Sequence, residues 1–199
     1  MIGNLLKTYW LSKGIKVGRG VTEKIIEQFE QKYSVRLPED VCDYFIEVNG
    51  MDNSSDSEYW VWDDQEITFW SLQDITRLPT DAQLIRVHNP TCLFEFADWS
   101  ICAHTYAIHL SNNLQEPNPV YVLYDQPIQI ANSFTEFALE YIKTNNDILF
   151  PDPRNSRRAG QVDPIFVGQA GLSPPADRPQ VNLRLSWKQQ AREFQLSVE

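Results

Sequence analysis

The sequence predicts an α+β fold: a central antiparallel sheet flanked by helices, followed by a Pro-rich C-terminal extension. Apolar residues keep helical spacing over 22–33 and 38–48, and a third helical pattern covers 134–142. Between them, from residue 67 onward, apolar residues alternate with polar ones as in half-buried strands. The chain has 199 residues, of which 42% are hydrophobic and 22% charged, so it can bury one sizeable core.

Local signals mark the ends of the three helices. Thr22 is a candidate N-cap for the first, and Pro38 suits the first position of the second. Gly50 is expected to end that second helix in a left-handed conformation. Ser133 and Glu136 have the spacing of a capping box, which predicts the start of the last helix.

The strands are predicted to form a meander. The first runs over 67–72, a hairpin joins 92–97 to 102–110, and two short strands cover 120–124 and 128–130. In the second arm of the hairpin, His104, Tyr106 and Ile108 are expected on one face, with Thr105 and Ala107 on the other.

Composition divides the chain into four segments. Residues 1–19 are predicted to be an N-terminal helical segment, and 20–147 the main domain. The stretch 148–180 is rich in Pro, Gly, Arg and Asp without periodicity, which predicts a flexible linker. Residues 181–199 regain alternating and helical spacing, so they are predicted to be a docking segment, with a swapped element or a latch onto the main domain as alternatives.

Charge and cysteine content indicate the compartment and the class of partner. Residues 1–150 carry a formal charge of −12 and residues 151–199 carry +2, which disfavours nucleic acid and favours a basic protein partner. The sequence shows no signal peptide and no apolar run of membrane-spanning length, so a soluble protein is expected. Its three cysteines form no paired framework, which favours the reducing cytoplasm.

Several segments together resemble the SUKH superfamily, which includes yeast cell-wall assembly regulators and bacterial immunity proteins. The likeness covers about residues 20–147, and its pieces come in the expected order. They are 25–33, 35–41, 49–50, 96–99, 106–108 and 130–137.

The resemblance implies a compact α+β scaffold that binds proteins. Many bacterial members look like immunity proteins that neutralise a cognate toxin, often a nuclease or deaminase, while fungal members are regulatory hubs with flexible flanks. The extension after residue 151 departs from the short bacterial pattern. Because one fold serves many functions, the site must carry the functional argument.

An acidic segment rich in tryptophan is the candidate partner-binding site. Acidic side chains steer a basic partner and tryptophans supply contact area, although an acidic loop whose tryptophans cover the core would have the same composition. The turn at 98–100 is expected to extend this patch if it lies alongside. The candidates are Asp56, Glu58, Trp60, Trp62, Asp63, Asp64, Glu95, Asp98 and Trp99.

The sequence has little that indicates a catalytic or metal site. Cys102 and His104 fall on one strand face with Cys92 on its neighbour, but the sequence has neither a CxxC nor a histidine pair at i, i+4. A cysteine nucleophile needs a thiolate beside a base, whereas Cys42 is expected on a helix face at polar spacing from the core residues. The neighbouring Asp63 and Asp64 are expected to be solvated loop residues.

These observations predict a non-enzymatic protein with no cofactor and no bound metal. The leading hypothesis is an immunity protein that neutralises a basic, nuclease-like toxin by stoichiometric binding. The alternative is a regulatory scaffold whose main domain and C-terminal segment hold separate partners. An uncharacterised enzyme is a third hypothesis, which a bound metal would favour.

Overall fold

The computed structural model describes residues 1–52, 63–78, 92–100, 103–124 and 127–151. The helices of these ranges are α1 (Ile2–Ser12), α2 (Glu23–Tyr33), α3 (Glu39–Glu47), α4 (Phe134–Ile142) and α5 (Asn146–Leu149). The strands are β1 (Val17–Arg19), β2 (Val48–Met51), β3 (Ile67–Phe69), β4 (Thr76–Arg77), β5 (Leu93–Trp99), β6 (His104–His109), β7 (Val120–Leu123) and β8 (Pro127–Ala131).

These strands form two antiparallel sheets. In the larger sheet the order is β3-β5-β6-β7-β8, with β4 paired to the first part of β5, and β1 pairs with β2 in a separate ribbon. A bulge between Glu95 and Ala97 shifts the register of β5 against β6. The α+β class and the antiparallel meander predicted from sequence are therefore confirmed.

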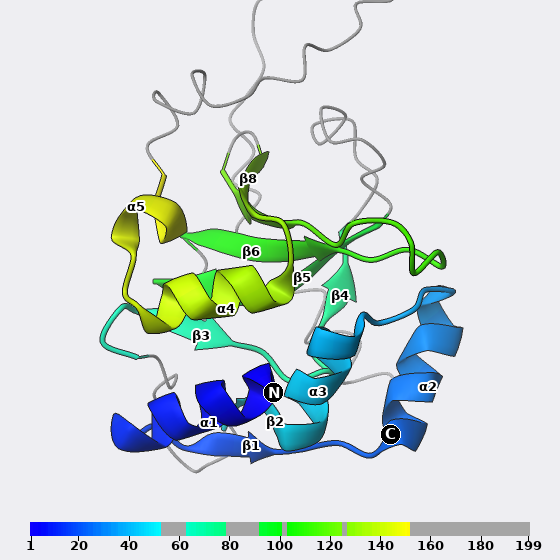
Figure 1. The fold of residues 1–199 in the computed structure, drawn as a ribbon, viewed down its shortest axis with the longest axis horizontal. Coiled ribbons are helices and arrows are strands. Elements are labelled where there is room, and N and C mark those ends of the chain that lie inside the picture. The colour runs from blue at the N-terminus through cyan, green and yellow to red at the C-terminus, as the bar shows by residue number, and fades with distance from the viewer. Residues whose placement is uncertain (53–62, 79–91, 101–102, 125–126, 152–199) are drawn as a thin grey trace, which may run out of the picture. The chain divides into compact units, whose positions relative to one another are not determined.

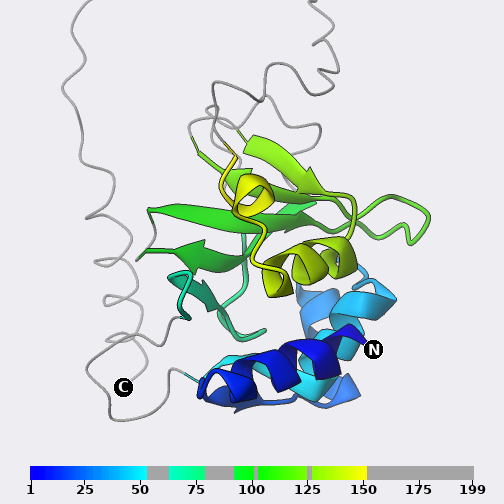
Figure 2. The ribbon, with the colours of Figure 1, turned by 60° about the vertical axis from the view of Figure 1, so that its left-hand side comes forward.

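The helices gather on one face and at one edge of the larger sheet. Figures 1 and 2 show α4 lying over a face of this sheet, while α1, α3 and the β1–β2 ribbon lie beyond its β3 edge. The face under α4 carries most of the core. A second, smaller cluster on the opposite face consists of Leu78, Leu93 and Ala107, with Tyr121 and Leu123 packed against it and no residue from a described helix.

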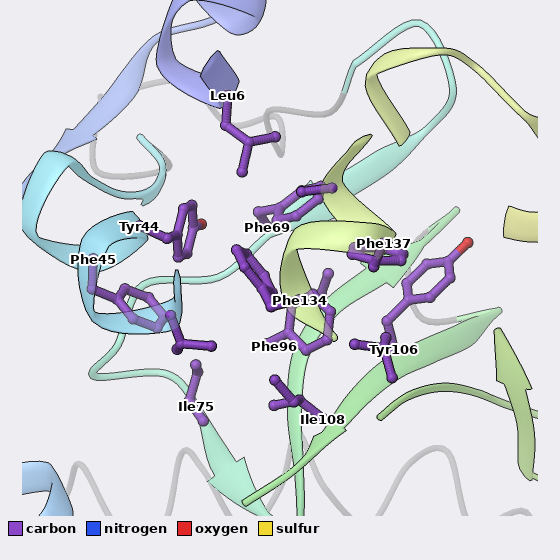
Figure 3. Close-up of a cluster of buried hydrophobic side chains, with 14 of the residues drawn as sticks. Leu6, Tyr44, Phe45, Phe69, Ile75, Phe96, Tyr106, Ile108, Phe134 and Phe137 are labelled. Atoms are coloured by element: carbon purple, nitrogen blue, oxygen red, sulfur yellow. The ribbon is translucent and has the colours of Figure 1, made fainter. Parts of the chain in front are cut away.

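Aromatic side chains fill the main core. Phe69 from β3 lies 4.9 Å from Tyr141 and 6.0 Å from Phe137 of α4 between ring centroids, and Figure 3 shows residues of α1, α3, α4 and the sheet meeting around it. Phe134 of α4 also packs on Tyr44 of α3, at 4.9 Å. Burial of this many large rings gives one continuous core.

The N-terminal segment contributes to this same core. Leu6 and Trp10 of α1 are completely buried, and the indole of Trp10 lies 5.0 Å from the ring of Phe69. Gly3 lies so close to α3 that an added Cβ would stand 2.6 Å from the carbonyl oxygen of Asp43. Thus α1 packs directly on the body that follows it in sequence.

Most helix boundaries follow their sequence signals. Thr22 is the N-cap of α2, and Ser133 accepts a hydrogen bond from the backbone N–H of Glu136 at 3.1 Å, which is one half of a capping box. The Glu136 carboxylate accepts from the backbone N–H of Asn132 at 2.7 Å. The prediction that Gly50 ends the second helix is wrong, because α3 ends at Glu47 and leads directly into β2. Gly50 does adopt a left-handed φ of +75°, but inside β2, where its Cα packs against the backbone of Trp70.

None of the helices in the described ranges combines the length and the apolar character needed to cross a bilayer.

Candidate partner-binding site

Five of the nine predicted site residues lie in the described parts of the chain. Asp63 and Asp64 begin a turn that leads into β3, while Glu95, Asp98 and Trp99 belong to β5. The other four predicted residues lie outside the described residues, namely Asp56, Glu58, Trp60 and Trp62.

Asp63 is buried at the centre of a hydrogen-bond network. Its carboxylate accepts bonds from the hydroxyl of Tyr141 at 2.6 Å and from the backbone N–H groups of Gln65 and Ile67, each at 2.9 Å. The Tyr141 hydroxyl in turn accepts a bond from the indole N–H of Trp10 at 2.7 Å. Asp63 therefore ties the start of β3 to α4 and, through Tyr141, to α1.

The expectation that Asp63 is a solvated loop residue is corrected by this geometry. Only 4% of the residue is exposed, and burial raises the pKa of its carboxyl, an effect opposed by its three hydrogen bonds. The same surroundings raise the pKa of Tyr141, chiefly through burial. Replacing Asp63 with lysine would place a cation in this network and disturb folding.

Asp64 has the opposite environment although it is the next residue. Its side chain is exposed and forms a 2.8 Å salt bridge with Lys13 at the end of α1. Glu66, two residues later, is also exposed and adopts a left-handed φ of 61°. Asp64 and Glu66 are therefore the exposed carboxylates of the 63–66 turn.

The 63–66 turn and the end of β5 lie side by side at one end of the larger sheet. The prediction of a turn over 98–100 is wrong in part, because Asp98 and Trp99 belong to β5 and the turn begins at Ser100. Ile67 is the register partner of Trp99, and the backbone N–H of Ser100 donates to the carbonyl of Glu66 at 2.9 Å. The sequence raised this adjacency as a condition for extending the acidic patch. The condition is met, since strand pairing places Glu66 and Ile67 beside Trp99 and Ser100.

Glu95 and Asp98 lie on the face of the sheet opposite α4. Glu95 accepts a 2.6 Å bond from the hydroxyl of Thr105, and Asp98 accepts a 2.7 Å bond from the indole N–H of Trp70. Burial raises the pKa of the Glu95 carboxyl, the Thr105 bond opposes that shift, and the negative charge of Asp98 adds to it. Both acids are thus positioned by the fold, and Asp98 is only 5% exposed.

Trp99 lies on the other side of β5, in a group of aromatic rings around His104. The Trp99 and His104 rings stack at 4.8 Å, and those of Tyr124 and Phe150 lie 4.8 and 5.8 Å from the imidazole. Burial lowers the pKa of His104 to about 4, so the imidazole is neutral at pH 7. Trp99 is therefore partly a core residue, because one ring face is used in stacking.

His104 and Cys42, the candidates for metal binding and nucleophilic catalysis, both have packing roles. His104 is enclosed by aromatic rings, and Cys102, its predicted companion, lies outside the described residues. Burial raises the pKa of the Cys42 thiol to about 11, which disfavours the nucleophilic thiolate. Within the described ranges, no three His, Cys, Asp or Glu side chains are grouped as a metal site would require.

Sequence reasoning missed the residues that hold the site in place. Trp10 and Tyr141 lie 131 positions apart, and their link to Asp63 exists only in the folded chain. Thr105 was predicted on the correct strand face but not as the partner of Glu95. A signal was present in Asp63 itself, because an acid two residues before a backbone N–H in a turn is a common side-chain acceptor.

Comparison with known proteins supports the resemblance seen in the sequence. No curated protein matches the chain. The model of the SMI1 / KNR4 family (SUKH-1) matches residues 20–140, which is more than half of the chain. The matched region includes α2, α3, all but the first strand, and most of α4, whereas α1 and β1 precede it. The chain therefore belongs to the SMI1 / KNR4 family (SUKH-1).

Proposed function

We propose that this chain is a non-catalytic protein-binding domain that neutralises a basic, nuclease-like toxin by stoichiometric binding in the cytoplasm. Membership of SUKH-1 supports a role in protein binding, because immunity proteins are a known part of this superfamily. The formal charge of −10 supports a basic partner, since opposite charge accelerates encounter and like charge disfavours nucleic acid.

The observation that carries the proposal is the adjacency of the 63–66 turn and residues 98–100 at the end of β5. It places the exposed carboxylates of Asp64 and Glu66 at the same end of the sheet as Trp99. We call Asp64, Glu66 and residues 98–100 the acidic end. A basic surface docking there would meet two exposed carboxylates on a turn held by hydrogen bonds, which lowers the ordering cost of binding.

The buried network makes this acidic end rigid. Asp63 fixes the turn that carries Asp64 and Glu66 through its bonds to two backbone N–H groups of that turn. Tyr141 and Trp10 hold Asp63 from the core side. An inhibitor benefits from such support because its contact residues need no rearrangement on binding.

The shifted ionisable groups also support binding rather than catalysis. Asp63 uses its carboxylate in three hydrogen bonds, and the imidazole of His104 is enclosed by aromatic rings. Cys42 donates its thiol hydrogen to the carbonyl of Leu37 at 3.6 Å. Each group thus has a packing role, while an enzyme needs such groups free to reach a substrate.

The test is affinity capture from the native host with the full chain, followed by a titration of the captured protein. The proposal expects one basic polypeptide whose toxic activity falls to zero at one equivalent of this chain. Capture of several housekeeping proteins, with no loss of any toxic activity on titration, would contradict it. That result would instead favour the regulatory scaffold.

The matched variants locate the contact. Asp64→Lys with Glu66→Lys should weaken capture, whereas Glu23→Lys with Glu27→Lys on α2 makes the same charge change at two other exposed positions and should not. Equal weakening by both pairs would assign the effect to net charge and remove the acidic end from the site.

A further inference from the structure

A polar pocket lies away from the acidic end, where three elements meet. It is formed by the C-terminal end of α2, the edge strand β4 and the loop after β6, and it has a volume of about 540 Å³. The lining residues that matter for binding are Tyr33, Ser34, Arg77, Ser111, Asn113 and Glu116. The predicted acidic site does not include any of them.

Arg77 supplies a positioned cation to this pocket. Its guanidinium carbon lies 5.5 Å from the ring centre of Tyr33 and 5.2 Å from that of Phe94, and one N–H group donates to the carbonyl of Tyr33. A guanidinium has five N–H donors in a fixed plane. In the described structure that one hydrogen bond leaves most of the guanidinium fork available to a ligand, while the Tyr33 and Phe94 rings lie beside it.

The loop opposite Arg77 is fixed by its own hydrogen bonds. The Ser111 hydroxyl accepts from the backbone N–H of Asn113 at 3.0 Å, and the Asn113 side-chain oxygen accepts from Gln115 N–H at 3.0 Å. Arg36 N–H donates to the carbonyl of Ser111 at 2.8 Å, which ties the loop to the end of α2. The amide NH₂ of Asn113 remains as a second donor in the pocket lining.

Two negative features limit the charge that the pocket accepts. Glu116 lines it, and the C-terminal end of α2 presents the negative end of the helix dipole. A doubly charged phosphate would be repelled more strongly than a singly charged carboxylate. Glu116 can in turn accept a hydrogen bond from a peptide N–H, which favours a carboxylate carried on a polypeptide.

We propose that this pocket binds an aspartate or glutamate side chain from a peptide segment of a protein partner. The Arg77 fork would hold the carboxylate in two parallel hydrogen bonds, with Asn113 as an added donor. Here the domain supplies a cation to an acidic partner group, whereas the acidic end supplies carboxylates to a basic one. This contact therefore gives the domain a second binding surface and stands whether or not the proposed toxin-binding function does.

The experiment is an NMR titration of the ¹⁵N-labelled full chain with acetyl-Ala-Glu-Ala-amide. The proposal expects saturable shifts at Ser34, the Arg77 side chain and residues 111–116, with a Kd on the order of 1 mM for so short a peptide. The matched peptide acetyl-Ala-Gln-Ala-amide should bind at least about 10-fold more weakly, because it lacks the charge-assisted bonds. Absence of saturation, or equal shifts with both peptides, would overturn the proposal.

Variants and a second anion complete the test. Arg77→Gln should abolish the shifts and Arg77→Lys should retain only part of the affinity, since lysine lacks the fork. Lys24→Gln, the same charge change at an exposed position on α2, should bind as the unmodified chain does. Full binding by Arg77→Gln would contradict the proposal, as would tighter binding of inorganic phosphate than of the glutamate peptide.

Discussion

On the face of the larger sheet beneath α4, Phe96 and Tyr106 are buried against Phe137, whereas on the opposite face Glu95 bonds Thr105 and Asp98 bonds Trp70. The strand residues of both sets come from β5 and β6. The first face depends on apolar burial that tolerates little change. The second combines a small apolar cluster with single polar contacts. The strands that build the core therefore also carry the acids.

The 63–66 turn repeats this contrast within one residue step. Asp63 points into the core network, and Asp64 points to solvent toward Lys13. We therefore expect substitutions on the covered side to change stability, and substitutions on the exposed side to change binding.

The largest effect is expected at Trp10, which the family match does not include. Trp10→Ala removes a completely buried indole and its bond to Tyr141, so the free energy of unfolding should fall by about 3–5 kcal/mol. Leu11→Ala, at a residue 56% exposed on the same helix, is the control and should cost less than about 1 kcal/mol. Urea unfolding followed by tryptophan fluorescence measures both free energies of unfolding. A loss for Trp10→Ala as small as that for Leu11→Ala would show that α1 is not part of the core.

Next in size is the contrast between the two neighbouring aspartates. Asp63→Ala leaves the Tyr141 hydroxyl and two backbone N–H groups without their acceptor, which should cost about 2–4 kcal/mol. Asp64→Ala breaks one exposed salt bridge and should cost no more than about 0.5 kcal/mol. Denaturant midpoints of the two variants give the comparison. If Asp63→Ala left the stability unchanged, the hydrogen-bond network around Asp63 would not stabilise the fold.

The aromatic group around His104 gives a pH-dependent prediction. The folded pKa of about 4 lies below the ordinary value of 6.5, so the unfolded chain binds a proton more readily between these values. Stability should therefore fall as pH decreases from 6.5 toward 4, by up to about 2 kcal/mol from this residue. His104→Gln lacks that contribution, and the difference between the unfolding free energies of the two proteins at pH 7 and pH 4.5 measures it. An unchanged difference would contradict burial of a neutral imidazole.

The smallest stability effect is expected on the face opposite α4. Thr105→Val removes the hydroxyl that donates to Glu95 and should cost about 1 kcal/mol. It should also raise the pKa of Glu95 further, because that bond holds the pKa down. Carboxyl titration by NMR would detect this shift, and a lower pKa in the variant would show that the bond is not made.

The sequence predicted the fold where spacing is local. The helix over 22–33, the capping box at Ser133 and the hairpin with His104, Tyr106 and Ile108 on one face all depend on residues close in sequence. The β1–β2 ribbon was missed because β1 is only three residues long and its partner begins directly after α3.

The candidate site was predictable only in part, because long-range contacts decide which acids are exposed. Asp63 and Asp64 have the same chemistry in sequence, and the buried position of Asp63 depends on a bond from Tyr141, 78 positions away. Arg77 was not singled out, since the pocket it lines is formed by segments far apart in the chain. In contrast, the adjacency of the 63–66 turn and the end of β5 follows directly from the pairing of β3 with β5.

The most direct test of the account is the salt dependence of association with the captured partner. The rate constant for the full chain should fall at least about 10-fold between 50 and 500 mM salt, since opposite charges steer the encounter. The Asp64→Lys, Glu66→Lys variant should associate more slowly at low salt and match the unmodified chain at high salt, while the Glu23→Lys, Glu27→Lys control keeps most of the low-salt rate. Equal rates for all three proteins at every salt concentration would contradict binding through the acidic end.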